Sequence, residues 1–451
     1  MHNSRCFTSL APLAKHGITL DQSYNETKVN VPFGFYIIMA AQFFSALADN
    51  ALLITAIAAL REMHAPSEYE PLLKTFFTVS YVVLAAFVGA FADSMPKWRV
   101  MFISNAVKIV GCSMMFWGAH PLAAYAVVGL GAAAYSPAKY GILTEYLPHR
   151  QLVVANGWIE GLTVGAIILG VVIGGTLIQP GVSQSLLAFD FPLISTGIDT
   201  TSEMALCFVA VFYLLASLFN LYVPDTGVDH KQLKKNPFYL IHEFNHCLSL
   251  LWRDKLGQIS LAVTTLFWGA GATLQFIVIK WSEVALGLDL SKSSMLQGVV
   301  AIGVATGAIL AAKFITLRKS VQVIPLGIAM GLIVLIMNFV HDMWLAVPLL
   351  IIIGGLSGFF VVPMNALLQH RGHILMGAGH SIAVQNFNEN ISILIMTGLY
   401  YLMIKMDISI YWVVTLFGIF VSTLMYIIRQ RHIANQKVHD DVQHLDDSAS
   451  H

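Results

Sequence analysis

The feature that most constrains this chain is a series of long apolar segments, of which the first runs from Gly34 to Leu60. About 20 apolar residues are enough to cross a bilayer as one helix. Asp49 lies in the middle of this segment with Asn50 beside it, and an ionised carboxylate there costs at least about 2.5–3.5 kcal/mol. We therefore predict that Asp49 and Asn50 belong to a substrate or ion path. The alternative is a carboxylate that only pairs with a neighbouring helix.

The composition is that of a membrane protein. Of the 451 residues, 57% are hydrophobic and 11% are charged, whereas soluble domains carry about 25% charged residues. The formal net charge is zero, which argues against nucleic acid as a partner. We predict an all-α membrane protein with twelve transmembrane helices, at about residues 34–61, 72–95, 98–119, 121–146, 154–178, 204–223, 257–283, 293–315, 320–341, 343–368, 375–403 and 409–428.

Orientation follows from the placement of lysine and arginine. These residues concentrate in the tails and in the loops of one side, whereas the long loop 179–203 contains none. Because cytoplasmic loops carry the excess of positive residues, we predict that both termini lie in the cytoplasm. Residues 1–33 lack a basic segment that leads into an apolar region and a cleavage site, so we expect a cytoplasmic tail and no signal peptide.

The chain is expected to form two six-helix halves, at residues 34–223 and 257–430, because one long polar loop (224–256) separates them. Residues 1–33 and 431–451 are the expected cytoplasmic tails. The halves share a motif, because Gly129–Lys139 and Gly355–Asn365 place glycine, leucine, proline and a final polar residue at matching positions. Duplicated halves around a central site are typical of transporters, and we therefore include Asn365 among the candidate site residues.

A lysine and an acid are predicted to form an anion site near the cytoplasmic end of the fourth and fifth segments. Lys139 follows the helix-kinking Pro137 and lies about 10 Å from that end at 1.5 Å per residue. Glu160 lies at a similar depth on the next helix and is its expected resting partner. The predicted ligand is a phosphate. The alternative is a lysine whose ammonium group simply reaches the interface.

The eleventh segment carries an unusually polar run, Gln385-Asn-Phe-Asn-Glu-Asn390. Glu389 lies close to Asp49 in depth, and two acids on related segments suit a cationic group or a proton. We therefore predict that Asn386 and Glu389 belong to the site. The alternative is that the amides only hydrogen-bond neighbouring helices. Lys108 also lies near mid-membrane, and the sequence indicates no partner for it.

One motif suggests a different class of protein. His242-Glu-Phe-Asn-His246 is a formal HExxH, the zinc-protease signature. It lies in the central loop, where a single apolar helix face predicts an amphipathic helix on the membrane surface; this face consists of Leu240, Ile241, Phe244, Cys247, Leu248 and Leu251. No third ligand is evident, and the four cysteines show no metal-type spacing. We therefore predict no metal and no cofactor, and keep a membrane zinc protease as a remote alternative.

The turn after the second segment resembles the GxxxD(R/K)xGR(R/K) loop of the major facilitator superfamily. It reads Gly89-Ala-Phe-Ala-Asp93-Ser-Met-Pro-Lys97-Trp-Arg99. The glycine permits close approach of two helices. We predict that Gly89, Asp93, Lys97 and Arg99 form a conformational latch at the cytoplasmic ends of the helices, with no substrate contact.

Several longer strings resemble the lysophospholipid transporter family, a bacterial inner-membrane branch of that superfamily. They are Ala41–Phe43 with Asp49–Leu53, Gly131–Leu143, Leu266–Gly271, Gly358–Gln369 and Ala383–Asn386. The resemblance implies a transporter rather than an enzyme. It implies that lysophosphatidylethanolamine and related lysophospholipids move from the outer to the inner leaflet of the inner membrane. The expected partners are this substrate, membrane lipids and a separate acyltransferase on the cytoplasmic side, which restores the second acyl chain.

The family's polar site residues match Asp49, Asn50 and Lys139 of this chain. A departure occurs at Gln275, where relatives have arginine; Lys280 lies five residues on and so on a different helical face. Gln275 is kept as a candidate site residue. The rival function within transport is a proton-coupled exporter of small amphipathic drugs, which would use Asp49 or Glu389 as its proton carrier.

Overall fold

The protein is described by a computed structural model, which covers residues 32–65, 69–188, 198–229, 236–288 and 290–438. The described residues from Phe33 onward belong to one compact unit. Almost all of the predicted N-terminal tail and most of the predicted C-terminal tail lie outside the described residues.

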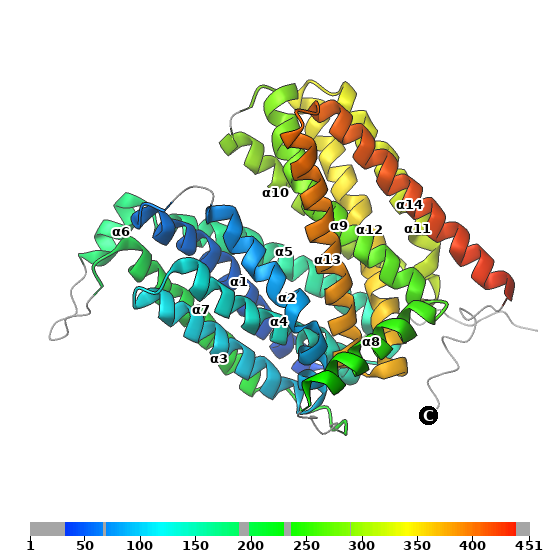
Figure 1. Ribbon diagram of the computed structural model, residues 1–451, viewed down its shortest axis with the longest axis horizontal. Helices are drawn as coiled ribbons and strands as arrows, with labels where there is room; N and C mark the ends of the chain where they lie inside the picture. The colour runs from blue at the N-terminus through cyan, green and yellow to red at the C-terminus, as the bar shows by residue number, and fades with distance from the viewer. Residues whose placement is uncertain (1–31, 66–68, 189–197, 230–235, 289, 439–451) are drawn as a thin grey trace, which may run out of the picture. The chain divides into compact units, whose positions relative to one another are not determined.

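The regular structure of the described residues is helical, as Figure 1 shows, and this confirms the predicted all-α fold class. Three short 3₁₀ segments, His149–Gln151, Leu317–Val323 and Leu335–Phe339, adjoin α5 and α11. The α-helices are α1 (Phe33–Glu62), α2 (Tyr69–Asp93), α3 (Lys97–Phe116), α4 (Pro121–Tyr146), α5 (Leu152–Leu177), α6 (Pro180–Leu187), α7 (Thr201–Leu221), α8 (Pro237–Arg253), α9 (Gly257–Ala285), α10 (Leu290–Phe314), α11 (Ile324–Val334), α12 (Met343–Met376), α13 (Ala378–Lys405) and α14 (Ile410–Val438).

Ten of the described helical segments are long and apolar enough to cross a membrane. Each of the twelve ranges predicted from sequence overlaps a long helical segment, but α4 and α13 are not among the ten. Both are long enough, with 26 and 28 residues. They also contain the polar residues predicted to form the site, which lower their mean hydropathy. The number of twelve transmembrane helices therefore stays a prediction.

The helices pack in two groups along the sequence, which we call the N-terminal helices (α1–α7) and the C-terminal helices (α9–α14). In the first group α1 contacts α5 and α7, and α3 contacts α4 and α7. In the second group α10 contacts α12, α9 contacts α13 and α11 contacts α14. The two groups meet where α2 and α4 contact α13, and where α5 contacts α10 and α12.

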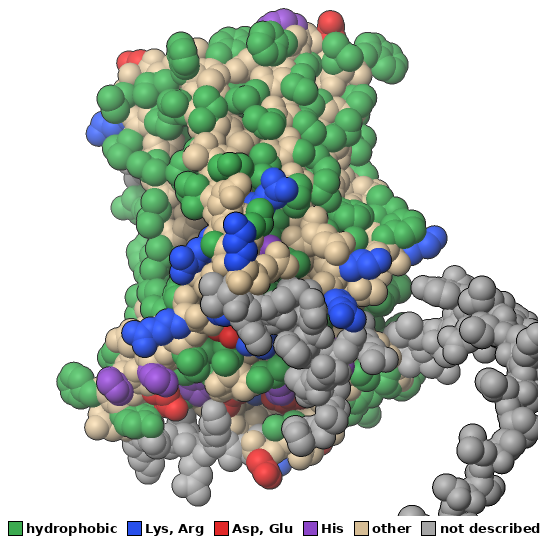
Figure 2. Space-filling view, turned by 90° about the vertical axis from the view of Figure 1, so that its right-hand side faces the viewer, with side chains coloured by type: hydrophobic (Ala, Val, Ile, Leu, Met, Phe, Trp, Pro, Cys, Tyr) green, Lys and Arg blue, Asp and Glu red, His purple; other side chains and the backbone are tan. Residues whose placement is uncertain are grey.

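The outer face of the C-terminal helices is suited to lipid over part of its height. In Figure 2 hydrophobic side chains cover the upper part of this face, and lysine and arginine side chains gather below them. Large apolar side chains of the C-terminal helices, such as Leu332 on α11 and Trp412 on α14, are exposed. Exposed apolar surface of this kind is stable in contact with acyl chains and unfavourable in contact with water.

Helix α8 contains the HExxH motif and differs from the prediction of a helix on the membrane surface. Its buried residues Leu240, Phe244, Cys247 and Leu251 pack against α2, α9, α12 and α13 instead of facing lipid. Phe244 lies edge-to-face on Phe387, with ring centroids 5.3 Å apart. The sequence identified an apolar helix face correctly, but the neighbouring helices cover it because they offer a matching apolar surface. Ile241, placed on this face from sequence, is exposed.

Leu251 should therefore contribute to the stability of the whole bundle. Leu251→Ala removes a fully buried side chain, which costs about 2–5 kcal/mol in a packed core. We expect a clearly lower thermal unfolding midpoint in detergent. The matched control is Ile241→Ala on the exposed face of the same helix, which should leave the midpoint nearly unchanged. Equal effects of the two substitutions would contradict the packing described for α8.

Candidate functional site

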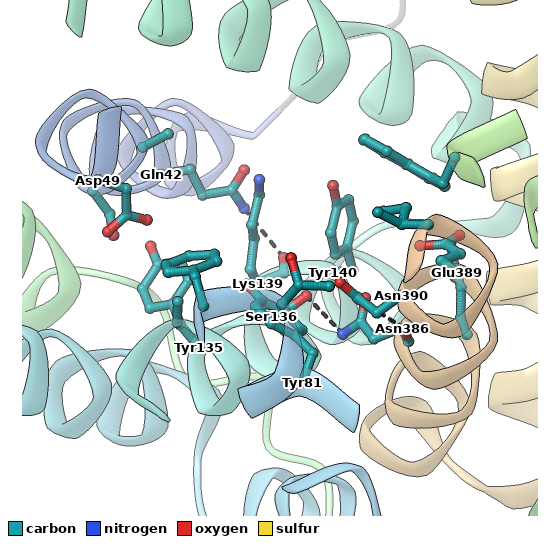
Figure 3. Close-up of a pocket in the computed structure, with 18 of the residues that line it drawn as sticks. Gln42, Asp49, Tyr81, Tyr135, Ser136, Lys139, Tyr140, Asn386, Glu389 and Asn390 are labelled. Carbon is teal, nitrogen blue, oxygen red and sulfur yellow. Dashed lines mark hydrogen bonds between the residues drawn. The ribbon is translucent and has the colours of Figure 1, made fainter. Parts of the chain in front are cut away.

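A cavity of about 270 Å³ lies between the N-terminal and the C-terminal helices. Figure 3 shows Asp49 and Glu389 on opposite walls of this cavity, with Lys139 between them. The residues that line it are Gln42, Ser45, Ala46, Asp49, Lys74, Phe77, Thr78, Tyr81, Lys108, Ala132, Tyr135, Ser136, Lys139, Tyr140, Trp268, Asn365, Gln385, Asn386, Glu389, Asn390 and Ile393. A cavity lined by both signs of charge inside apolar helices is an unusual feature for a purely structural bundle.

The Asp49 carboxylate is held by two groups from other N-terminal helices. Lys108 Nζ lies 2.8 Å from Asp49 Oδ2, and the Tyr213 hydroxyl donates to Asp49 Oδ1 at 2.7 Å. The Lys108 side chain is only 1% exposed, whereas that of Asp49 is 21% exposed and reaches the cavity. Lys108 also donates to Ser45 Oγ at 3.0 Å, and its ammonium lies 4.8 Å from the centroid of the Tyr135 ring.

This network provides the partner of Lys108 that the sequence did not indicate. It also gives Asp49 two roles, because the carboxylate neutralises a buried lysine and still presents an edge to the cavity. Removing one member of such a buried ion pair costs about 3–5 kcal/mol. The wall formed by α1, α3 and α7 is therefore rigid, and the charge of Asp49 is largely balanced by Lys108.

Lys139 lies on α4 two residues after Pro137 and lines the cavity. Its backbone carbonyl accepts a hydrogen bond from Gln42 Nε2 at 3.1 Å, which ties α1 to α4 beside the site. Its ammonium lies 4.8 Å from the centroid of the Tyr140 ring. The side chain is half-buried, so it can contact a ligand in the cavity.

The opposite wall is a network of amides around one acid. Gln385 Nε2 donates to Glu389 Oε1 at 2.7 Å and to Asn365 Oδ1 at 3.1 Å. These three residues and Asn386 are buried and line the cavity. The polar run on α13 thus does make the interhelical amide contacts of the alternative explanation. It also orients a carboxylate toward the cavity, so the two explanations are compatible.

Two candidate residues with described side chains, Asn50 and Gln275, do not line this cavity. Asn50 lies beside Asp49 on α1, but its side chain donates to the Ala46 carbonyl at 2.8 Å and packs against α5 at Gly170. Gln275 is exposed on α9. Glu160 lies on α5, but its side chain is outside the described ones, so its pairing with Lys139 stays a prediction.

The two groups of helices are joined at one end through Asp93, the last residue of α2. Its carboxylate accepts hydrogen bonds from the backbone N–H of Gly379 at 2.7 Å and of His380 at 3.2 Å, and so caps the start of α13. His380 Nδ1 lies 2.6 Å from the same carboxylate. Backbone N–H groups at a helix start favour an anion. We call this end of the bundle the closed end.

Lys97 extends these contacts toward α4. Its buried ammonium lies 2.8 Å from Asp93 Oδ1 and 3.2 Å from Glu145 Oε1. A Cβ atom at Gly89 would lie 3.0 Å from both the Cβ of Ala383 and the Cα of His380, so glycine allows α2 and α13 to approach. Arg99 is different, because it is exposed and lies over the Trp98 ring at 5.1 Å.

Further polar contacts cross between the two groups of helices. Asn386 Nδ2 donates to Ser136 Oγ at 2.8 Å. Asn156 and Gln369 exchange two hydrogen bonds, of 3.0 and 2.9 Å, and are almost completely buried. The Asn156–Gln369 pair was not predicted, because nothing in the sequence indicates which two buried amides face each other.

Metal chemistry finds no support in the described residues. They contain no group of three or more His, Cys, Asp or Glu side chains that could hold a metal ion. Both histidines of the HExxH motif, His242 and His246, are exposed on α8.

Comparison with other proteins identifies the family. Residues 38–397 match the model of the Major Facilitator Superfamily. A protein of Yersinia enterocolitica named "Lysophospholipid transporter LplT" is 42% identical over 378 residues, which are 84% of this chain and 89% of that protein. A protein of Yersinia pestis strain Pestoides F with the same name is 43% identical over 370 residues, covering 82% of this chain and 86% of the relative.

Solved structures show the same fold at low sequence identity. The human organic anion transporter MFSD10 matches with a TM-score of 0.70 and 12% identity, over 89% of this chain and 100% of that chain. The transporter FucP in the outward conformation matches with a TM-score of 0.67 and 12% identity, over 89% and 98%. With the fold, the charged cavity between two groups of helices and these relatives in agreement, the chain belongs to the lysophospholipid transporter family of the major facilitator superfamily.

Proposed function

We propose that this protein transports lysophospholipids across a bacterial inner membrane, from the outer to the inner leaflet. The observation that carries the proposal is the cavity lined by lysines and acids between the two groups of helices. A lysophospholipid has a phosphate, often an ammonium group, and one acyl chain. The similarity to proteins named lysophospholipid transporters supports the same substrate class.

In this proposal the two walls of the cavity bind the two charges of the head group. Lys139 binds the phosphate, because its side chain lines the cavity from α4. Glu389, held in place by Gln385 at 2.7 Å, binds the ammonium group from α13. Asp49 is less suited to a direct contact with a cation, since Lys108 already lies 2.8 Å from it. Asn365 and Asn386 complete the polar wall.

Transport requires that the cavity open alternately to the two sides. The contacts at Asp93, at Asn156–Gln369 and at Ser136–Asn386 close one end. The distribution of lysine and arginine supports a cytoplasmic position for this end and for both termini. We propose that residues 34–223 and 257–430 act as two halves that rock about the cavity. A separate acyltransferase on the cytoplasmic side would then acylate the delivered lipid.

The decisive experiment measures uptake of labelled lysophosphatidylethanolamine into proteoliposomes, with and without an imposed proton gradient. Uptake that depends on the protein supports the proposed substrate. Absence of uptake, together with gradient-driven movement of small amphipathic drugs, would favour the rival exporter. The substitution Glu389→Gln distinguishes the two functions further. An exporter that uses Glu389 as its proton carrier would lose the coupling of drug transport to the proton gradient.

Lys139 is the first residue to test by substitution. Lys139→Glu should abolish uptake, because it places an anion against the phosphate in a site of low dielectric constant. Lys139→Arg should retain part of the activity, since the charge persists in a bulkier, planar group. Lys139→Gln should lower uptake about tenfold, a loss of about 1.4 kcal/mol of binding free energy. Full uptake by Lys139→Gln at wild-type expression would show that Lys139 is not the phosphate ligand.

The latch can be tested by removing the charge of Asp93. Asp93→Asn keeps the size of the side chain but weakens its bonds to Lys97 and to the start of α13. We expect lower transport and a several-fold faster reaction of a cysteine at position 136 with a membrane-impermeant thiol reagent from the closed end. The matched control is Arg99→Gln, which replaces an exposed side chain in the same turn. Unchanged labelling in a folded Asp93→Asn protein would refute the latch.

The HExxH motif is expected to have no part in activity. Both histidines are exposed on α8, and exposed substitutions usually change stability by less than about 0.5 kcal/mol. The double substitution His242→Ala with His246→Ala should therefore keep uptake within about twofold of wild type. Loss of uptake combined with zinc bound to the wild-type protein would instead support the protease alternative.

A further inference from the structure

A third lysine lines the same cavity and differs from the other two in its surroundings. Lys108 is paired with Asp49 at 2.8 Å, and the ammonium of Lys139 lies over the Tyr140 ring. Lys74, on α2, lines the cavity, and its side chain makes no hydrogen bond or ion pair in the part of the chain that the structure describes. A charge without a partner, on a helix that is otherwise apolar, calls for an explanation.

The helix α2 presents Lys74 to the cavity as the first member of a stripe. Lys74, Phe77, Thr78 and Tyr81 all line the cavity, and their spacing of three and four residues places them on one helical face. The stripe is held in place by ring contacts, because the Phe77 ring lies 5.6 Å from that of Tyr125 and 5.7 Å from that of Tyr81. Lys74 therefore faces the cavity because the packing of α2 fixes this face.

The position of Lys74 along the bundle is far from the closed end. At 1.5 Å per residue, Lys74 lies about 28 Å from Asp93 along α2, and Lys139 about 9 Å from Glu145 along α4. Asp93 and Glu145 share one level, because Lys97 contacts both. The two lysines thus mark opposite ends of the cavity, with Lys139 near its closed end and Lys74 toward the other side. The Lys74 side chain is also exposed, as a residue at a cavity mouth must be.

We propose that Lys74 is the first phosphate-binding residue of the substrate path, which captures the head group at the mouth of the cavity before Lys139 binds it at depth. This inference rests on the proposed function. An exposed cation at the rim of a binding site raises the rate of encounter with an anion, and its effect weakens with salt. It contributes little once the ligand has moved on, so it acts on capture and not on the later conformational step.

The test is the concentration dependence of lysophosphatidylethanolamine uptake by proteoliposomes. Lys74→Gln should raise KM about three- to tenfold and change the maximal rate by less than twofold. Lys74→Arg should keep the wild-type KM. The effect of Lys74→Gln should shrink at high salt, because the screening length falls from about 10 Å at 0.1 M to about 3 Å at 1 M. Lys74→Met is a second neutral variant, and thermal unfolding confirms that each protein is folded.

The matched control is Lys280→Gln. Lys280 is also an exposed lysine, but it lies beside Glu283 at 3.8 Å on α9 and does not line the cavity. Its substitution should leave KM unchanged. An unchanged KM for Lys74→Gln, a rise that salt does not affect, or the same rise for Lys280→Gln would overturn the role of Lys74. Absence of uptake by the wild-type protein would instead overturn the proposed function, so the two failures are distinguishable.

Competition with a second lipid shows whether the phosphate is the recognised group. Monoacylglycerol has one acyl chain and no phosphate. Its inhibition of uptake should be equal in the wild-type protein and in Lys74→Gln. Unlabelled lysophosphatidylethanolamine should inhibit the variant several-fold more weakly than the wild type. Equal weakening for both competitors would mean that Lys74 serves general access to the cavity, which would contradict the proposal.

Discussion

The cost of placing charge among apolar helices governs this structure. Lys108 is almost completely buried, and an unpaired ammonium there would cost several kcal/mol. Asp49 and Tyr213 remove most of that cost by bringing α1, α3 and α7 together around one ion pair. The same contacts fix the wall of the cavity, so packing of the N-terminal helices and formation of the site have one physical cause.

A similar constraint acts at the closed end, but across the two groups of helices. Asp93 is buried and satisfies its charge with Lys97 and with the first N–H groups of α13. A Cβ atom at Gly379 would collide with the Asp93 carboxylate, so a glycine is required at that position. Because these partners belong to different groups of helices, the contact can form only when the groups are close. Such a contact stabilises one arrangement of the bundle and not the other.

Sequence alone predicts the features that depend on depth, and not those that depend on rotation about a helix axis. Apolar length placed the helices. Depth placed Asp49 and Glu389 at one level, with Lys139 nearer the cytoplasmic end, and all three line the cavity. The sequence did not predict the direction in which each side chain points. Asn50 adjoins Asp49 but packs toward α5, and Gln275 is exposed. The partner of Lys108 was missed for the same reason. The apolar face of α8 was predicted, but its covering by other helices depends on tertiary packing.

The charges that line the cavity suggest how a ligand could drive its closure. Three lysines and two acids line it, so with all groups ionised the formal charge is +1. Within this lining, Asp49 and Lys108 balance each other. In the proposed mode of binding, a bound phosphate would offset the positive charge, and an ammonium group on the same ligand would face Glu389. Closing the empty cavity to both sides would move these lining charges away from water, at a cost of several kcal/mol per ion. A ligand with a phosphate would lower that cost where the cavity is closed to both sides more than where it is open to one side. Such a difference between two states is what lets binding shift a conformational equilibrium.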